Sequence, residues 1–312
     1  MNLFITGAGG YIGGSVAAAL LADGHHVRGL TRSEHSAAQL AALGITPVLG
    51  ALDDADLLAR EARQSDGVIN TANADHLGAV QALIAGLAGS GKPLLHTSGS
   101  SVVGDDVRGA HISAQVFDGE GPLLVNPAKQ ARHDIDLQVL GAAAQGVRSA
   151  VICPSLIYGV GTGLNPNSVQ IPFLVANARQ HGTVQIVGAG ANVWSNLHID
   201  DVVSLYLLAL AKAPPGAFYF AENGEASFAD LGAAIARRLG LPGITALPPE
   251  VAAERWGEPK AYFSLGSNSR VRATRARTEL GWLPRHASVL DWITNDMPVE
   301  APSPSPSKPG LN

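Results

Sequence analysis

The sequence predicts an α/β fold, in which a doubly wound parallel sheet is followed by a smaller mixed α/β lobe. Short apolar runs alternate with segments of strong helix formers through the first half of the chain, a pattern typical of βαβ units. A glycine-rich turn connects the first expected strand to the first expected helix. Of the 312 residues, 46% are hydrophobic and 15% are charged, so the chain can bury a substantial core.

The first expected strand, residues 2–5, leads directly into the glycine-rich turn, and residues 15–21 follow as a helix. Gly7 lets the chain turn off the strand, Gly10 leaves room for a pyrophosphate, and Gly13 lets the helix pack closely on the strand. The free N–H groups at the helix N-terminus favour a bound phosphate. The turn therefore predicts a dinucleotide site. Its expected contacts are Gly7, Gly9, Gly10, Tyr11, Ile12 and Gly13.

The Thr-Gly-x-x-Gly-x-x-Gly spacing at this position resembles the short-chain dehydrogenase/reductase superfamily, in its extended or atypical branch of NAD-dependent epimerases and dehydratases. Residues 147–161, 192–203 and 263–284 are similar to three further landmarks of that branch, in the same order. The resemblance extends over about residues 1–295. It implies a nicotinamide cofactor, a parallel Rossmann sheet and a substrate lobe.

Three parts are expected along the chain. Residues 1–160 form the dinucleotide-binding Rossmann core, which returns in part at about residues 185–212. Residues 161–299 supply most of the substrate lobe. Residues 300–312 are dominated by proline and serine and have no apolar face to bury, so we expect a disordered tail.

NADPH is the expected cofactor, because a base stands where an NADH-binding protein usually has an acid. The strand expected at residues 26–30 is followed by Thr31 and Arg32, and the Arg32 guanidinium suits a 2′-phosphate. The alternative is a solvated surface arginine. The resemblance also places residues 153–155 beside the nicotinamide, although Cys153 follows an apolar strand and suits a packed thiol. The further expected cofactor contacts are Leu52, Thr71, Ala72, Asn73, Thr97, Cys153, Pro154 and Ser155.

The resemblance implies a catalytic serine or threonine followed by a Tyr-x-x-x-Lys pair, and this sequence lacks the pair. No tyrosine occurs between Tyr11 and Tyr158. Ser98 and Ser100 follow the fifth expected strand, where the family keeps its serine or threonine. A plain serine-rich loop is the alternative. A serine alone is too weak an acid to replace a lysine-assisted tyrosine.

Other residues are candidates for the missing acid. In a helix expected to open near residue 125 and to run to about residue 144, Lys129 and His133 fall in the turn where the pair would lie. A histidine has an ordinary pKa of about 6.5, which suits proton transfer, but an exposed histidine on a polar face is the alternative. Tyr158 follows a later strand, and no lysine adjoins it. The catalytic candidates are therefore Ser98, Ser100, Lys129, His133 and Tyr158.

Three functions are compatible with these motifs. The first is an NADPH-dependent reductase that transfers hydride to a small carbonyl, enone or quinone, since conjugate reduction delivers hydride to carbon and depends less on a dedicated acid. The second is a nucleotide-sugar epimerase or dehydratase, which the C-terminal landmark favours and the missing tyrosine opposes. The third is a protein that binds NADP(H) without turnover and senses redox state.

Charge and composition exclude several other classes. The net charge of −5 gives no basic footprint for nucleic acid, and no apolar run is long enough to span a membrane. The single cysteine excludes a disulfide framework and a cysteine-based metal site. We therefore expect a cytoplasmic monomer or homodimer that acts on a small-molecule substrate.

His198 and Asp200 stand two residues apart, a spacing compatible with a metal or catalytic pair. The resemblance implies a structural role instead, in which the acid caps a helix expected over residues 202–210. We therefore expect no metal site.

Overall fold

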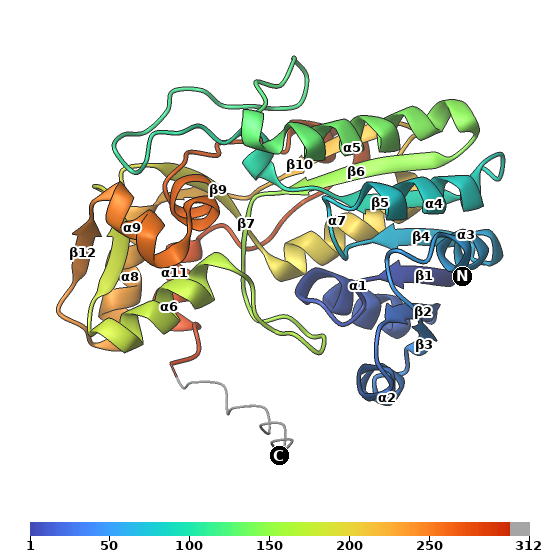
Figure 1. Ribbon diagram of the computed structural model, residues 1–312, viewed down its shortest axis with the longest axis horizontal. Helices are drawn as coiled ribbons and strands as arrows, with labels where there is room; N and C mark the ends of the chain where they lie inside the picture. Colours follow the sequence, from blue (N-terminus) through green and yellow to red (C-terminus); the bar gives the residue numbers. More distant parts are fainter. Residues whose placement is uncertain (300–312) are drawn as a thin grey trace.

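The computed structural model describes residues 1–299 and contains a parallel sheet of seven strands in the order β10-β6-β5-β4-β1-β2-β3 (Figure 1). The strand order changes direction between β1 and β4, and ligands of open α/β sheets bind at such a point. The strands are β1 (Asn2–Thr6), β2 (His26–Thr31), β3 (Thr46–Leu49), β4 (Gly67–Asn70), β5 (Pro93–Thr97), β6 (Arg148–Pro154) and β10 (Ala217–Ala221).

Helices cover both faces of this sheet, which confirms the predicted doubly wound fold. One face shares an apolar core with α1, α2, α7 and α10, and the other shares a core with α3, α4 and α5. These helices are α1 (Tyr11–Ala22), α2 (Glu34–Ala42), α3 (Ala55–Gln64), α4 (Leu77–Leu87), α5 (Gln130–Gly141), α7 (Ile199–Lys212) and α10 (Thr274–Leu280).

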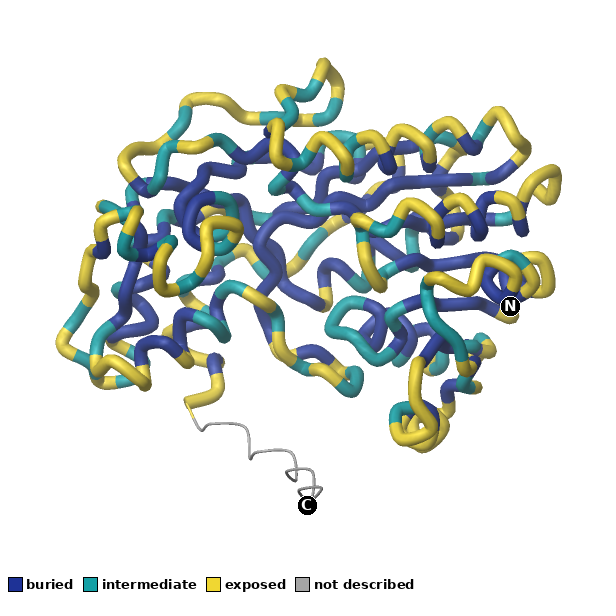
Figure 2. Tube along the Cα trace, viewed as in Figure 1, coloured by how far each residue is buried: buried dark blue, intermediate teal, exposed yellow. Residues whose placement is uncertain are grey.

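The central strands are buried along nearly their whole length (Figure 2). Every residue of β4 and β5 is buried, as expected for parallel strands that are covered on both faces. Asn70 and His96 are polar members of these two buried runs. Because a buried polar group needs a hydrogen-bond partner, these two residues indicate a polar network inside the sheet.

A smaller lobe lies beside the main sheet (Figure 1). It contains a three-stranded sheet in the order β11-β9-β7 and a two-stranded sheet of β12 and β8. Aromatic rings of Tyr158, Trp194 and Phe228 belong to its core. Its elements are β7 (Leu156–Tyr158), α6 (Gln170–His181), β8 (Val184–Val187), β9 (Val193–His198), β11 (Glu225–Ser227), α8 (Phe228–Leu239), β12 (Ile244–Leu247), α9 (Pro249–Trp256), the π-helix η4 (Pro259–Leu265) and α11 (Val289–Asn295).

The predicted elements are present, with shifted ends. α1 starts at Tyr11, and α5 starts after the 3-10 turn η2 (Pro127–Lys129). The sequence analysis does not predict α3, which begins where the Asp54 carboxylate accepts a hydrogen bond from Leu57 N at 3.0 Å. Within residues 1–299, none of the helices is both long and apolar enough to span a bilayer. The expected tail, residues 300–312, lies outside the described residues.

α7 begins earlier than predicted, and a different residue caps it. His198 Nδ1 accepts a hydrogen bond from Asp200 N at 3.2 Å, so the histidine caps the helix and the acid does not. Asp201 instead accepts hydrogen bonds from the backbone N–H groups of Arg285, at 2.8 Å, and His286, at 2.9 Å. This carboxylate therefore holds the C-terminal segment against α7.

Candidate functional site

The turn between β1 and α1 has the close packing that its glycines predict. Gly7 has a φ of 76°, a left-handed conformation that favours glycine. A Cβ at Gly13 would lie 2.3 Å from both Gly7 O and Thr71 Oγ1, so only glycine allows this approach of helix and strand. Gly10 is the N-cap of α1 and carries no capping side chain, which leaves the first-turn N–H groups open to an anion.

A cavity of about 890 Å³ opens beside this turn. Gly9 lines this cavity, and a Cβ there would meet Leu164 at 3.7 Å, an ordinary contact. Arg32 is exposed on the wall beside Ser33, whose hydroxyl accepts a hydrogen bond from Ser36 N at 3.2 Å. The predicted cofactor residues on this wall are Gly7, Gly9, Gly10, Thr31, Arg32, Leu52, Ala72 and Asn73.

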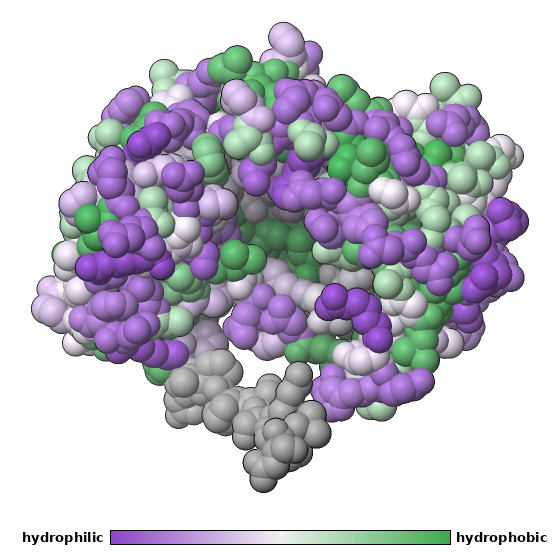
Figure 3. All heavy atoms as spheres, viewed as in Figure 1, coloured by the Kyte–Doolittle hydropathy of each residue, from purple (hydrophilic) through white to green (hydrophobic). Residues whose placement is uncertain are grey.

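A second cavity, of about 610 Å³, continues the first, because Gly10 and Ala72 line both. Trp194, Pro259 and Phe263 of the lobe also line it. Figure 3 shows a hollow on this face of the molecule, with hydrophobic residues at its floor. We call the two cavities together the cofactor groove. The predicted residues in its second part are Tyr11, Ile12, Thr71, Ser98, Ser100, Lys129, Pro154 and Ser155.

Two predicted catalytic residues lie away from the groove. Tyr158 is buried in the lobe, where its hydroxyl donates to the His286 carbonyl at 3.0 Å and its ring packs on Trp292. Burial raises the pKa of this hydroxyl. His133 lines a separate small cavity beside Phe218. The structure therefore brings Ser98, Ser100 and Lys129 together and leaves His133 and Tyr158 elsewhere.

Three predicted cofactor residues lie beneath the groove rather than on its wall. Gly13 packs under the glycine turn, as described above. Thr97 Oγ1 lies 2.5 Å from the Tyr206 hydroxyl in the core. Cys153 is fully buried, and burial raises the pKa of its thiol, which keeps the thiol protonated. These three residues lie between the groove and the hydrophobic core, and they therefore support the floor of the groove.

Two cations lie at the start of α5 and line the groove. Arg132 forms a bidentate ion pair with Asp75, with Nε–Oδ1 at 2.8 Å and Nη2–Oδ2 at 2.6 Å. This hydrogen bonding holds the pKa of Asp75 below its usual range, so the carboxyl stays ionised. Burial, followed by the nearby Arg132 charge, lowers the pKa of Lys129. Lys129 is therefore the freer of the two cations to act on a ligand.

A chain of buried polar groups runs beneath the groove from β1 to α5. Thr6 Oγ1 donates to Asn70 Oδ1 at 2.5 Å, and Asn70 Nδ2 lies 2.9 Å from His96 Nδ1. His96 Nε2 lies 3.7 Å from Asp136 Oδ1. Ser98 Oγ donates to Asp136 Oδ2 at 2.6 Å. All five side chains are buried, and Ser98 is the member that lines the groove.

Burial shifts the pKa values of the two titratable groups in this chain of hydrogen bonds, Asp136 and His96, in opposite directions. It raises the pKa of Asp136 to about 7, although the Ser98 hydrogen bond and the Arg132 charge oppose the rise. It lowers the pKa of His96 to about 4. Near neutral pH the imidazole is therefore uncharged, while the carboxyl is present in both of its forms. A group with a pKa near the working pH is well suited to proton exchange.

His96, Asp75 and Asp136 are not predicted from the sequence as members of the site. One signal was available, since Lys129, Arg132 and Asp136 are spaced i, i+3 and i+7, which places them on one face of a helix. By the same spacing His133, four residues after Lys129, belongs to this face, yet it lines another cavity. No sequence pattern indicates that the face meets the end of β5, because this contact joins residues that are far apart in the chain.

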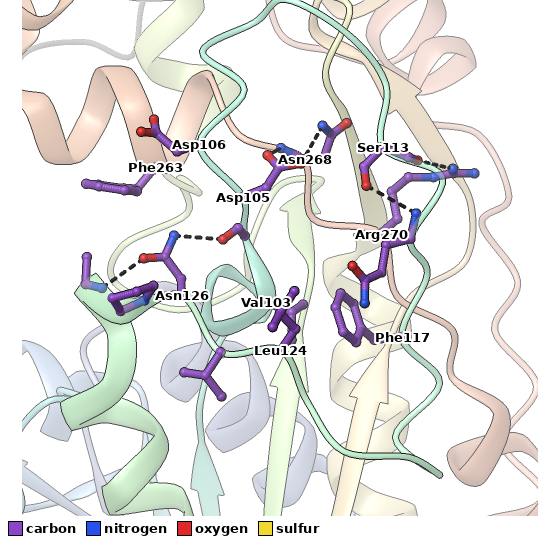
Figure 4. Close-up of a pocket in the computed structure, with 15 residues that line it drawn as sticks. Val103, Asp105, Asp106, Ser113, Phe117, Leu124, Asn126, Phe263, Asn268 and Arg270 are labelled. Atoms are coloured by element: carbon purple, nitrogen blue, oxygen red, sulfur yellow. Dashed lines mark hydrogen bonds between the residues drawn. The ribbon is translucent and has the colours of Figure 1, made fainter.

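A third cavity, of about 570 Å³, lies beneath the segment between η1 (Ser100–Val103) and α5. Figure 4 shows Val103, Phe117 and Leu124 gathered on one side of it, with Arg270 nearby. Phe263 lines both this cavity and the second part of the cofactor groove, so the two are neighbours.

His198, Asp200 and His286 bring ligand-type atoms within 4.8 Å of one another. The two imidazole rings stack with centroids 4.0 Å apart. His198 Nδ1 caps α7, and His286 Nδ1 lies 3.2 Å from Asp201 Oδ2. Both Nδ1 atoms therefore make contacts that stabilise the fold.

A family model described as the NAD dependent epimerase/dehydratase family matches residues 3–219. The chain belongs to this family. The matched residues include the glycine turn, the buried polar chain and both cations of the groove. Membership in an NAD-dependent family supports a nicotinamide dinucleotide as the cofactor of this chain.

Individual relatives of this epimerase/dehydratase family member extend over nearly its whole length. The oxidase ucsJ from Acremonium sp is 33% identical over 328 residues, which covers 91% of this chain and 92% of the relative. The 4-hydroxy-2-methyl-3-oxo-4-farnesyl-3,4-dihydroquinoline-1-oxide ketoreductase from Stigmatella aurantiaca is 28% identical over 337 residues, covering 96% and 97% of the two chains. These relatives and the family make the chain an NAD(P)-dependent enzyme of the oxidoreductase type.

A solved structure supports the same fold. DesIV, the dTDP-glucose 4,6-dehydratase from Streptomyces venezuelae, was solved with NAD bound and is similar to this chain with a TM-score of 0.74. The two are 24% identical, and the similarity covers 94% of this chain and 95% of DesIV. At this identity the likeness concerns the fold alone.

Proposed function

We propose that this member of the epimerase/dehydratase family is an NADPH-dependent reductase that transfers hydride to a small organic carbonyl, enone or quinone. The observation that carries the proposal is the continuity of the cofactor groove, which runs from Arg32 at one end to Ser98 and Lys129 at the other. A bound reduced nicotinamide would supply the hydride. The residues of the chain would position the cofactor and the acceptor.

The NADPH preference is supported by the residues around Arg32. Its exposed guanidinium lies beside Ser33 and Ser36 at the start of α2, and hydroxyl and guanidinium donors suit a 2′-phosphate. Asp53 also lines this cavity, but its Oδ1 lies 3.1 Å from His76 Nε2. That contact draws the carboxylate toward the imidazole rather than toward a ribose hydroxyl.

We propose that the acceptor binds in the second part of the groove, below the lobe. The side chains of Trp194, Pro259 and Phe263 supply an apolar surface there, which suits the flat face of an enone or quinone. The neighbouring third cavity would take an apolar substituent of the acceptor. The Stigmatella relative is named as a ketoreductase, which supports a carbonyl acceptor.

A nucleotide-sugar epimerase or dehydratase is the second candidate, favoured by the family. Such reactions begin by oxidising a hydroxyl and need a base. Tyr11 lines the groove, but its hydroxyl donates to the carbonyls of Tyr158, at 3.0 Å, and Gly159, at 2.9 Å. Because that hydroxyl is engaged and burial raises its pKa, Tyr11 is a poor replacement for the missing base. A redox sensor that binds NADP(H) without turnover is the third candidate.

Oxidation of NADPH separates these candidates. The protein would be mixed with NADPH and, in turn, with menadione, cyclohexenone, cyclohexanone and an aldehyde. We expect oxidation with at least one acceptor, and His133→Ala and Tyr158→Phe should leave the rate unchanged because both side chains lie away from the groove. Conversion of dTDP-glucose without net NADPH loss would favour the second candidate. Tight NADPH binding without oxidation would favour the sensor.

We also propose that the protein works in the cytoplasm as a monomer or homodimer, without a nucleic-acid partner. The net charge of −5 supports the absence of a nucleic-acid partner, because a negatively charged protein repels a polyanion. Sedimentation of the full chain gives the oligomeric state directly.

A further inference from the structure

Two buried polar atoms face one another without hydrogen-bond partners among the described residues. They are His96 Nε2 and Asp136 Oδ1, which lie 3.7 Å apart. Buried polar atoms in native proteins usually have partners, so this pair beneath the groove calls for an explanation. The Asp136 side chain therefore has one oxygen held by Ser98 and one oxygen in a loose contact.

The hydrogen-bond directions in the buried chain define the proton positions. Asn70 Oδ1 accepts from Thr6 Oγ1, so its Nδ2 donates to His96 Nδ1. The neutral imidazole therefore carries its proton on Nε2, which points toward Asp136 Oδ1. Because the N–H group of His96 faces Oδ1, the other oxygen of Asp136, Oδ2, is the atom that can exchange a proton with Ser98.

The protonation state of Asp136 decides what the Ser98 hydroxyl can do. When the carboxyl is ionised, Ser98 donates its hydrogen to Oδ2, and the groove meets only the lone pairs of Oγ. When the carboxyl is protonated, Oδ2–H donates to Oγ, and the serine hydrogen is free to point into the groove. Since Ser98 is the member of the chain that lines the groove, only it can deliver this hydrogen to a ligand.

We propose that Ser98 donates the proton to the acceptor oxygen and that Asp136 returns a proton to Ser98, so that the two together replace the absent tyrosine. The inference rests on the proposed reductase function and names its acid. As hydride reaches the carbonyl carbon, the carbonyl oxygen takes the hydrogen of Ser98 Oγ. Oγ in turn takes the hydrogen of Asp136 Oδ2. The carboxylate that remains is protonated again from water after the product leaves.

The groups around Asp136 are consistent with this cycle. Within the described part of the chain, the charged or titratable side chains that face it come from β5, β6, α5, α10 and the loop before α4. Arg132 favours the carboxylate, whereas burial and Asp75 favour the acid, and together they raise its pKa to about 7. The charged or titratable side chains around Asp136 are His96, Cys153, Arg132, His133, Arg275 and Asp75.

A first test needs no turnover. Infrared spectroscopy of the full chain would follow the C=O stretch of protonated carboxyl groups from about pH 5 to about pH 9. We expect a band that disappears with a midpoint near neutrality and that is missing in Asp136→Asn. Asp134→Asn, on the exposed side of the same helix, should retain it. The absence of such a band in the wild type would overturn the inference.

A second test measures single-turnover NADPH oxidation with cyclohexanone and cyclohexenone as a matched pair. Ser98→Ala should slow cyclohexanone reduction by about a hundredfold, the usual effect of losing a general acid, and should slow cyclohexenone reduction less. Ser98→Thr should restore part of the ketone rate. In Asp136→Asn the amide can still hydrogen-bond Ser98 but cannot supply a proton, so the ketone rate should fall. The buried Ser149→Ala is the control.

The pH profile separates proton supply from a merely structural effect. The wild-type ketone rate should fall as pH rises through the pKa of Asp136, because only the acid form returns a proton, and the profile of Asp136→Asn should be flat. Wild-type oxidation that Ser98→Ala leaves unchanged would overturn the inference while the reductase function stands. No wild-type oxidation with either acceptor or with menadione would overturn the proposed function, and this proton donor with it.

Discussion

At the scale of a single residue, Arg32 is expected to select the phosphorylated cofactor. Its guanidinium is exposed on the groove wall, and a charge-assisted hydrogen bond contributes about 1.5–3 kcal/mol. Arg32→Ala should therefore weaken NADPH binding roughly ten- to hundredfold and leave NADH binding nearly unchanged. Fluorescence titration with both cofactors checks this. The exposed Arg60→Ala is the matched control, and equal wild-type affinity for the two cofactors would contradict the prediction.

Asp136 should also make the stability of the fold depend on pH. Burial raises its pKa to about 7, so the folded protein binds this proton more tightly than the unfolded chain does. The resulting stabilisation is fully present at low pH and is lost as pH rises toward 7. His96 acts in the opposite sense, because burial lowers its pKa to about 4 and its neutral form stabilises the fold at higher pH.

Replacing the Asp136 carboxyl with an amide isolates the contribution of this group to the pH dependence of the free energy of unfolding. Relative to the wild type, Asp136→Asn should gain stability steadily as pH rises from about 5 to about 8, since the variant has no carboxylate to bury. Urea unfolding at several pH values measures the difference. Asp134→Asn should show a constant difference, and a constant difference for Asp136→Asn as well would refute the explanation.

At the scale of an element, the glycines of the β1–α1 turn should separate cofactor binding from folding. A Cβ at Gly10 would meet Gly7 O at 3.1 Å, a contact that needs only a small adjustment. Gly10→Val should therefore fold, but its side chain would fill the phosphate space and abolish NADPH binding. Unchanged affinity in the folded variant would mean that the turn is not the phosphate site.

Gly13→Ala is the contrasting variant in the same turn. Its Cβ would lie 2.3 Å from Gly7 O and Thr71 Oγ1, too close to be accommodated without moving the backbone. We expect a loss of about 1–3 kcal/mol in the free energy of unfolding, as for other overpacked positions. Urea unfolding of the two variants side by side tests the contrast, and equal losses would contradict it.

At the scale of the whole molecule, Asp201 connects the C-terminal segment to α7. Its carboxylate accepts hydrogen bonds from the N–H groups of Arg285 and His286. Asp201→Ala should lower the free energy of unfolding by about 1–3 kcal/mol for each donor that stays buried without a partner. The neighbouring, exposed Asp200→Ala should cost less than about 1 kcal/mol. Urea unfolding measures both, and similar losses would argue against the connection.

The sequence alone determined the parts of this protein that depend on neighbouring residues. The strand, glycine turn and helix are consecutive in the chain, so their chemistry can be read from residues 2–21 without a partner segment. The same holds for Arg32 after β2 and for the serines after β5. The absence of the catalytic tyrosine is also evident without a structure, since no tyrosine occurs between Tyr11 and Tyr158.

Only the tertiary structure decided which faces meet. Lys129 and His133 are four residues apart and equally plausible in the sequence. Lys129 ends the 3-10 turn η2 and lines the groove, whereas His133 lies within α5 and lines another cavity. The Tyr158 side chain is buried in the lobe, where its hydroxyl donates a hydrogen bond to the carbonyl of His286, a residue far along the chain. The Asp136 carboxyl gains its altered pKa from burial, and burial is a property of the packed molecule that no local pattern encodes.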